Sequence, residues 1–88
     1  MTEPLRVRAD ALEWREVDGE IVALDLRRSV YLAINPSGAL LWPALVEGAS
    51  RDELVTLLSG EAGISTEVAS ADVDRFLSEL AEHGLLDE

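Results

Sequence analysis

Several residue types are missing or rare in this 88-residue chain, and each absence excludes a kind of structure or chemistry. The chain has no cysteine, which excludes disulfide bonds, thiolate metal sites and thiol redox chemistry. It has no apolar run near the ~20 residues that a membrane-spanning helix needs. The first ten residues also lack the apolar core of a signal peptide, so we expect a cytoplasmic protein.

Basic residues are scarce as well, and the balance of charge is strongly acidic. Seven basic residues, all of them arginine, stand against 18 acidic residues, which gives a formal net charge of −11. Residues 47–88 hold eleven of the acids and only two of the arginines. A surface of this sign repels phosphate backbones, so the composition favours basic or neutral partners over nucleic acid.

The chain does contain enough apolar residues for one folded domain. Hydrophobic residues make up 48% of the sequence, which is ample for a core. A chain of this length buries only ~60–65% of its unfolded surface, so that core must be compact. We therefore expect a single domain over residues 1–88.

Alternating apolar residues predict three strands in the first part of the chain. The patterned segments are Leu12–Val17, Ile21–Leu26 and Ser29–Ile34. Asp18-Gly19 is a strong hairpin turn and Arg27-Arg28 is a short link, so the strands should form an antiparallel meander. Residues 1–11 are mixed, and they fit either a short edge strand or a frayed terminus.

One face of this meander is expected to be buried. It would carry eight apolar side chains: Leu12, Trp14, Val22, Leu24, Leu26, Val30, Leu32 and Ile34. The opposite face would be a weaker apolar patch, formed by Ile21, Ala23, Tyr31 and Ala33.

The first of three predicted helices follows the meander directly. Asn35 is a good N-cap, and Pro36 suits the first helical position because its missing N–H has no helical partner there. The helix should run to about Val46. Pro43 lies inside it and removes a hydrogen bond at a cost of ~3 kcal/mol, so we expect a kink or an early end near that residue.

Capping signals delimit the other two helices. Ser50 and Glu53 have the spacing of a capping box, which predicts a second helix from Arg51 to Gly60. The third should begin near Ser65 or Thr66 and end at His83. Gly84 then follows as the C′ residue, and Leu85 can fold back on Leu80 in a Schellman arrangement. The order of elements predicts an α+β fold, winged helix-turn-helix-like, with a three-stranded antiparallel sheet followed by three helices.

Candidates for catalysis are few. His83, the only histidine, lies in a last helical turn, where capping or a surface position is the expected role. Asp72 and Asp74 point about 200° apart around a helix, so they do not form a paired-carboxylate site. Ser37 does not lie in a nucleophile elbow, and no residues have the spacing of metal ligands or of a phosphate-binding loop. We therefore expect a protein that is not an enzyme and needs no cofactor or metal.

DNA binding would be another use of three helices beside a small sheet, with the third helix in the major groove. That helix carries only one cation, Arg75. Its acidic residues are Glu67, Asp72, Asp74, Glu79 and Glu82. A helix of this charge would be repelled by the duplex, which argues against a winged-helix DNA-binding protein.

Peptide binding suits the same architecture better. The segment Ser29–Ile34 is the last strand of the meander and could lie at a sheet edge. There, unpaired N–H and C=O groups can accept an extended peptide as an additional strand. In the alternative, Tyr31 and Ala33 simply pack beneath a helix, and the residues alone leave both interpretations open.

The chain also resembles a known family through an ordered set of residues. They are Gly19-Glu20-Ile21, Leu24-Asp25, Tyr31, Ile34-Asn35, Gly38 and Trp42, closed by Asp72-Val73, Phe76, Leu80 and Gly84-Leu85-Leu86. The set spans roughly Leu12 to Leu86 and is similar to the PqqD-like proteins. These are the RiPP recognition elements, which bind leader peptides of ribosomally made precursors. The version here is most similar to the free-standing leader-binding proteins of lasso peptide biosynthesis, although Pro43 departs from the family's form.

The resemblance implies that a leader adds as a strand beside the third strand, in a groove closed by the third helix. The implied peptide-binding residues are Ser29, Val30, Tyr31, Leu32 and Ala33 on the strand, with Asp72, Arg75, Phe76 and Glu79 on the helix. Lasso leaders are recognised through a Tyr and a Pro, so the resemblance implies an apolar pocket. Simpler roles compete at three positions: Phe76 as core, Glu79 as surface, and Arg75 in a salt bridge to Asp72 or Glu79.

The partners implied by the resemblance are a precursor leader peptide and a separate leader peptidase. In the lasso case that peptidase is a transglutaminase-like cysteine protease. An alternative within the same fold is a peptide chaperone of a radical-enzyme pathway such as pyrroloquinoline quinone biosynthesis. A homodimer formed through the edge strand is a further alternative, and it would occupy the implied binding site.

Overall fold

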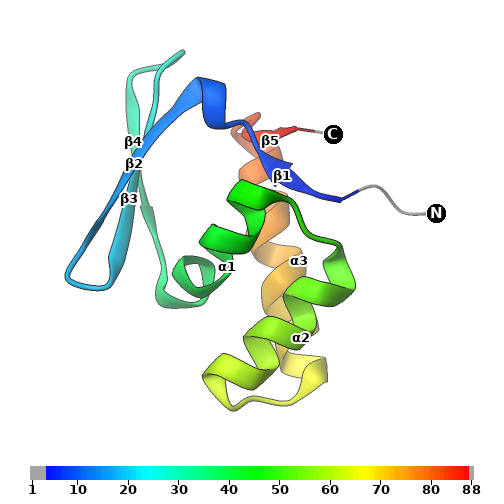
Figure 1. The fold of residues 1–88 in the computed structure, drawn as a ribbon. Helices are drawn as coiled ribbons and strands as arrows, with labels where there is room; N and C mark the ends of the chain where they lie inside the picture. Colours follow the sequence, from blue (N-terminus) through cyan, green and yellow to red (C-terminus); the bar gives the residue numbers. More distant parts are fainter. Residues whose placement is uncertain (1–3, 88) are drawn as a thin grey trace.

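The structure is a computed structural model that describes residues 4–87, apart from the side chain of Ala9. A three-stranded antiparallel sheet lies on one side of the molecule and three helices lie on the other (Figure 1). The elements are β1 (Arg6–Val7), a 3₁₀ turn (Ala9–Ala11), β2 (Leu12–Val17), β3 (Glu20–Asp25), β4 (Val30–Ile34), α1 (Pro36–Glu47), α2 (Arg51–Ala62), α3 (Thr66–Glu82) and β5 (Leu86–Asp87). The predicted α+β class and the order of sheet and helices are confirmed.

The meander has the strand order β2-β3-β4. Asp18 and Gly19 both have positive φ, 53° and 82°, as the predicted tight hairpin requires. The second turn is longer than the predicted two-residue link, because residues 26–29 all lie in it. Ser29 has φ 56° and belongs to this turn, so β4 begins at Val30.

The predicted faces of the sheet are wrong for the middle strand. Residues directly opposite each other in an antiparallel pair share a face, and Trp14 lies opposite Ala23, which lies opposite Leu32. The face turned to the core therefore carries Leu12, Trp14, Ile21, Ala23, Asp25, Val30, Leu32 and Ile34. Val22 and Leu24 lie on the outer face with Tyr31 and Ala33, and Leu26 lies in the turn.

Helix α1 starts as predicted but does not end early. The N–H of Gly38 donates to Asn35 Oδ1 at 2.7 Å, and Pro36 is the first helical residue. The helix continues through Pro43 to Glu47. Burial of Trp42 and Leu45 on either side of the proline, each contributing ~1.5–3 kcal/mol, outweighs the ~3 kcal/mol that the proline costs.

The capping signals of α2 and α3 are confirmed, with one correction. Ser50 and Glu53 form both bonds of the capping box. Helix α2 passes through Gly60 and ends at Ala62, because the left-handed residue is Gly63, at φ 66°. Helix α3 begins after its N-cap Ser65 and ends in the predicted Schellman motif, in which the N–H of Leu85 donates to the Leu80 carbonyl at 2.8 Å.

Two short strands, one near each end of the chain, pair with each other. β1 pairs with β5, a strand that the sequence did not predict, and forms a separate two-stranded sheet. The predicted strand in residues 1–11 is therefore present but is not an edge of the meander, and residues 1–3 lie outside the described part. No helix in the described residues is long and apolar enough to cross a membrane.

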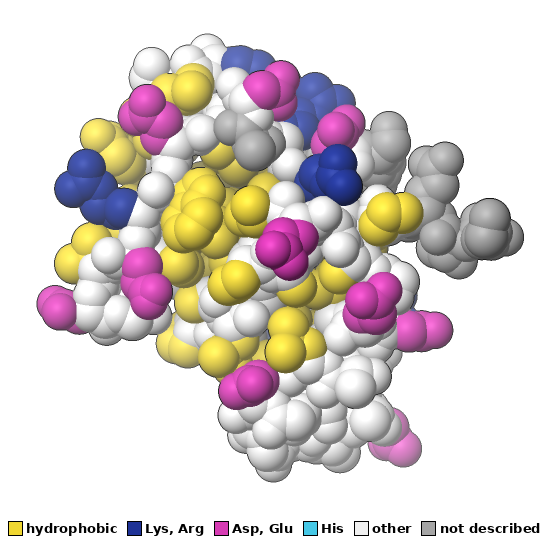
Figure 2. Space-filling view, in the orientation of Figure 1, with side chains coloured by type: hydrophobic (Ala, Val, Ile, Leu, Met, Phe, Trp, Pro, Cys, Tyr) yellow, Lys and Arg dark blue, Asp and Glu magenta, His cyan; other side chains and the backbone are white. Residues whose placement is uncertain are grey.

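The core lies between the helices and the inner face of the sheet. Its largest fully buried side chains include Trp42, Leu54, Leu58 and Leu85. Trp42 meets Trp14 edge-on, with ring centroids 5.9 Å apart, which joins α1 to β2. Figure 2 shows apolar side chains gathered where the sheet meets the helices, with acidic side chains spread around them.

Candidate functional site

The outer edge of β4 is open and carries no charge. β4 is last in the sheet and pairs only with β3, which confirms the predicted edge position. Its sequence, VYLAI, has no charged residue. The opposite edge strand, β2, carries Glu13, Arg15 and Glu16. Charged side chains on an edge discourage further pairing, and the edge of β4 lacks them.

Two adjoining hollows lie along α3, the larger between β4 and α3 and the smaller between the start of α1 and α3. The larger, about 120 Å³, is lined by Leu32, Ala33, Ile34, Asn35, Phe76, Glu79, Leu80 and His83. The smaller, about 30 Å³, is lined by Asn35, Ser37, Asp72, Arg75, Phe76 and Glu79. Asn35, Phe76 and Glu79 line both hollows. The two hollows therefore form one continuous groove along α3. We refer to these two hollows together as the β4–α3 groove.

The β4–α3 groove has an apolar floor and a polar rim. Ile34, Phe76 and Leu80 are buried, and Leu32 is half-buried. Asp72 and Arg75 form an ion pair one helical turn apart on the rim, as one of the simpler interpretations predicted. Since this pair is neutral overall, the remaining acid Glu79 sets the charge of the rim.

Phe76 is both a core residue and a wall of the groove, so its two predicted roles coexist. Only 6% of its surface is exposed, yet it lines both hollows. Its position depends on Gly38 in α1, where an added Cβ would lie 2.6 Å from Phe76 Cε1 and 2.7 Å from Ile34 Cγ2. The ring can rest against the start of α1 only because residue 38 has no side chain.

The structure brings six of the nine predicted site residues together in the groove. They are Leu32, Ala33, Asp72, Arg75, Phe76 and Glu79. The other three line neither hollow: Ser29 lies in the turn, Val30 opens β4 with 42% of its surface exposed, and Tyr31 is 72% exposed on the outer face.

Five groove residues were not predicted as site residues: Ile34, Asn35, Ser37, Leu80 and His83. Sequence reasoning had assigned Asn35 to capping and His83 to the helix end. The spacing of His83 offered a signal, because it lies four residues after Glu79 and so on the same side of α3. Asp72 and Asp74 bind different arginines, Arg75 and Arg51, as expected for carboxylates that do not form a pair.

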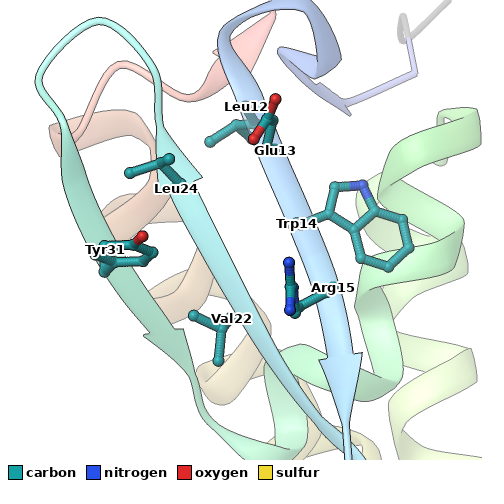
Figure 3. A pocket seen from close by; sticks show the side chains of 7 residues that line it. All are labelled: Leu12, Glu13, Trp14, Arg15, Val22, Leu24 and Tyr31. Carbon is teal, nitrogen blue, oxygen red and sulfur yellow. The ribbon is translucent and has the colours of Figure 1, made fainter.

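A larger hollow lies elsewhere, over the outer face of the sheet (Figure 3). It measures about 650 Å³ and is lined by Leu12, Glu13, Trp14, Arg15, Val22, Leu24 and Tyr31. This hollow is broad and covers a sheet face, where backbone groups are already paired between strands. The β4–α3 groove is smaller but follows unpaired backbone, so it is the better candidate for a peptide. No group of three or more potential metal ligands occurs in residues 4–87.

Known proteins share both the sequence pattern and the fold. The family described as coenzyme PQQ synthesis protein D (PqqD) matches residues 20–86. No curated protein sequence gives a significant match.

Two solved structures superpose on nearly the whole chain. One is TbiB1 in complex with the TbiA(beta) leader peptide, at 28% identity and a TM-score of 0.83, covering 93% of this chain and 94% of that one. The other is lasso peptide synthetase B1 complexed with the leader peptide, at 25% identity and a TM-score of 0.81, covering 97% and 99%. With the family match spanning most of its length and this fold, the chain belongs to the PqqD family.

Proposed function

We propose that this protein binds the leader peptide of a ribosomally synthesised lasso precursor by adding it as a strand to β4. The observation that carries the proposal is the uncharged, unpaired edge of β4 beside a groove walled by α3. The proposal is supported by the two leader-peptide complexes that share the fold.

In strand addition, backbone hydrogen bonds and side-chain contacts contribute to binding in different ways. Main-chain hydrogen bonds to β4 would fix the register of the leader, each contributing ~0.5–1.5 kcal/mol net. Alternate leader side chains would point into the β4–α3 groove, since successive residues of a strand face opposite sides. Ordering the leader costs free energy, so apolar side chains on the floor formed by Ile34, Phe76 and Leu80 must supply most of the affinity.

The chemistry of the groove narrows the kind of segment that fits. Its floor is apolar, and the unpaired acid on its rim is Glu79. An acidic leader side chain at that point would be repelled, whereas a neutral or basic one would be accepted. The apolar floor agrees with the Tyr and Pro anchors that the family resemblance implies.

We infer that binding, rather than cleavage, is the role of this chain. Asp72 and Arg75, two charged side chains on the rim, form an ion pair with each other. The leader would therefore be presented to a separate leader peptidase, of the transglutaminase-like cysteine type in lasso pathways. Such a peptidase would act on the part of the precursor that extends beyond the groove.

A second candidate function has one specific observation in its favour. The matching family is described by its role in coenzyme PQQ synthesis, which favours a peptide chaperone for a radical-enzyme pathway. The same groove would serve, and only the precursor would differ. Comparing a lasso leader with a pyrroloquinoline quinone precursor peptide in one binding assay separates the two functions.

The proposed function is tested by a pair of neighbouring substitutions in β4. Leu32 lines the groove, whereas Tyr31 lies on the outer face. With a fluorescein-labelled leader of the precursor encoded beside this chain, we expect Leu32→Ala to weaken binding by roughly tenfold, since three carbon atoms of a half-buried side chain are lost from the groove. Tyr31→Ala should change the affinity less than about threefold, because only solvent-exposed surface is lost.

Fluorescence anisotropy gives both dissociation constants, and circular dichroism shows whether each variant is folded. A larger effect of Tyr31→Ala than of Leu32→Ala in folded variants would place the peptide on the outer face and contradict the proposal.

A further inference from the structure

The turn between β3 and β4 is bonded to the end of α3. This turn, residues 26–29, lies at the end of the β4–α3 groove where His83 lines the larger hollow. Arg27 Nη2 donates a hydrogen bond to the carbonyl oxygen of Gly84 at 2.9 Å. An added Cβ at Gly84 would come within 3.1 Å of the same guanidinium nitrogen, so the two groups are in close contact.

A buried carboxylate fixes the other side of Arg27. Asp25 is 1% exposed and is the one charged residue that is buried in residues 4–87. Its Oδ1 accepts hydrogen bonds from the backbone N–H groups of Arg27, at 3.0 Å, and Arg28, at 3.4 Å. The same oxygen lies 3.8 Å from Arg27 Nε. Burying a carboxylate is costly unless it is paired and hydrogen-bonded, so this turn is held in one conformation.

No other hydrogen bond in the described residues joins the meander to α3 or the residues after it. At the Ile34 end of β4, Phe76 and Ile34 are held together by packing around Gly38. β4 is therefore held against α3 by apolar packing at its Ile34 end and by the Arg27–Gly84 bond at its turn end.

We propose that Arg27 is a positioning residue for leader binding, which holds β4 at a fixed distance from α3. This inference rests on the proposed function, because it concerns the same groove. With the bond in place the groove exists before the leader arrives, and less free energy is spent on forming it. Without the bond, the turn end of β4 can move away from α3, and only a fraction of molecules can bind.

The test compares two adjacent arginines of the same turn. Arg27→Met removes the donor to Gly84 and keeps most of the apolar stem. Arg28→Met removes an equal charge from a side chain that makes no hydrogen bond or ion pair in residues 4–87, and so serves as the matched control. If the broken bond leaves about one molecule in ten with a formed groove, apparent affinity for the labelled leader falls about tenfold. We expect that loss for Arg27→Met, less than about twofold for Arg28→Met, and partial recovery for Arg27→Lys.

A distance measurement separates positioning from general destabilisation. The chain has no cysteine, so spin labels can be attached at Glu13→Cys in β2 and Glu82→Cys in α3, both exposed positions. We expect Arg27→Met to broaden the label-to-label distribution of the free protein, measured by double electron–electron resonance, and bound leader to narrow it again. Arg28→Met should leave the distribution as in the parent protein.

Three results would overturn the inference: an unchanged distribution in Arg27→Met, an unchanged affinity, or equal losses in the two methionine variants. Failure of the parent protein to bind any leader would instead contradict the proposed function. In that case the distance distribution of the free protein still decides whether Arg27 holds the sheet against α3.

Discussion

At the scale of single residues, the shape of the groove depends on one missing side chain. Gly38 lies in the first turn of α1, and its N–H donates a hydrogen bond to the side chain of the N-cap Asn35. The Phe76 ring occupies the space that a Cβ at this position would need. Adding a single methyl group here would therefore change a core contact and the groove wall together.

We expect Gly38→Ala to weaken both folding and leader binding. An alanine Cβ would lie 2.6 Å from the Phe76 ring, and relieving that overlap costs roughly 1–3 kcal/mol in a packed core. The displaced ring would move toward the hollows that it lines, so the groove would become shallower. Thermal unfolding and leader anisotropy measure the two effects in the same variant.

Gly60 provides the matched control for this substitution. It lies inside α2, and an added Cβ would meet nothing within 4 Å. Gly60→Ala should therefore raise stability by about 0.5–1 kcal/mol, since alanine is the better helix former. Binding should stay unchanged. Stabilisation of similar size in both alanine variants would show that Phe76 does not restrict residue 38.

At the scale of elements, most of the sequence signals were local, and those predictions are confirmed. The Ser50–Glu53 capping box, the Asp18-Gly19 turn and the Schellman motif at Gly84 each involve groups only a few residues apart. The end of α1 depended on tertiary burial instead, whereas α2 continues past Gly60 to the left-handed Gly63. Leu45 is fully buried beyond Pro43, and no local propensity carries that information.

The buried face of the sheet could have been predicted from the turns. A two-residue link always joins an even-numbered residue to an odd-numbered one, so the buried face changes between even and odd positions at each hairpin. The four-residue turn at residues 26–29 also changes the parity, because the odd-numbered Asp25 lies opposite the even-numbered Val30. Assigning even positions to one face in both strands was therefore inconsistent with any such link.

The contact between α2 and α3 should make stability depend on pH. Arg51 donates to both carboxylate oxygens of Asp74, at 2.6 and 2.9 Å. The hydrogen bond from the guanidinium lowers the pKa of Asp74 below its ordinary value of 3.8. A lowered folded-state pKa means that the pair stabilises the protein above the ordinary pKa, and that this stabilisation is lost as the pH falls through the lowered value.

We therefore expect Asp74→Asn to be slightly less stable than the parent protein at pH 7, where the pair is fully formed. The difference in melting temperature should shrink as the pH falls below about 4. Arg51→Met should show the same trend, because it removes the other partner. A difference between parent and Asp74→Asn that stays constant down to pH 3 would contradict this assignment.

At the scale of the whole molecule, the edge of β4 carries no charged residue and pairs with no further strand in residues 4–87. β2 carries charged residues along the opposite edge, and β1 pairs with β5 away from the meander. The uncharged edge of β4 and the larger hollow beside α3 lie side by side. This coincidence, rather than any one residue, makes β4 the candidate for peptide addition.

The sequence predicted the strand and helix that form the groove, but only part of its lining. The positions on α3 were implied by the family resemblance, and Asp72, Arg75, Phe76 and Glu79 all line the groove. The lining from Asn35 and Ser37 depends on how α1 turns away from β4. At that point Gly38 packs against Phe76, a residue far away in the sequence.

The most direct test of strand addition to β4 is an NMR titration of isotope-labelled protein with the unlabelled leader. We expect saturable amide shifts concentrated in β4 and along α3 from Asp72 to His83. We also expect intermolecular contacts between α-protons of the leader and of β4, which only a paired strand can give. Shifts confined to β2 or the outer face of the sheet, with no contacts to the β4 backbone, would contradict the account.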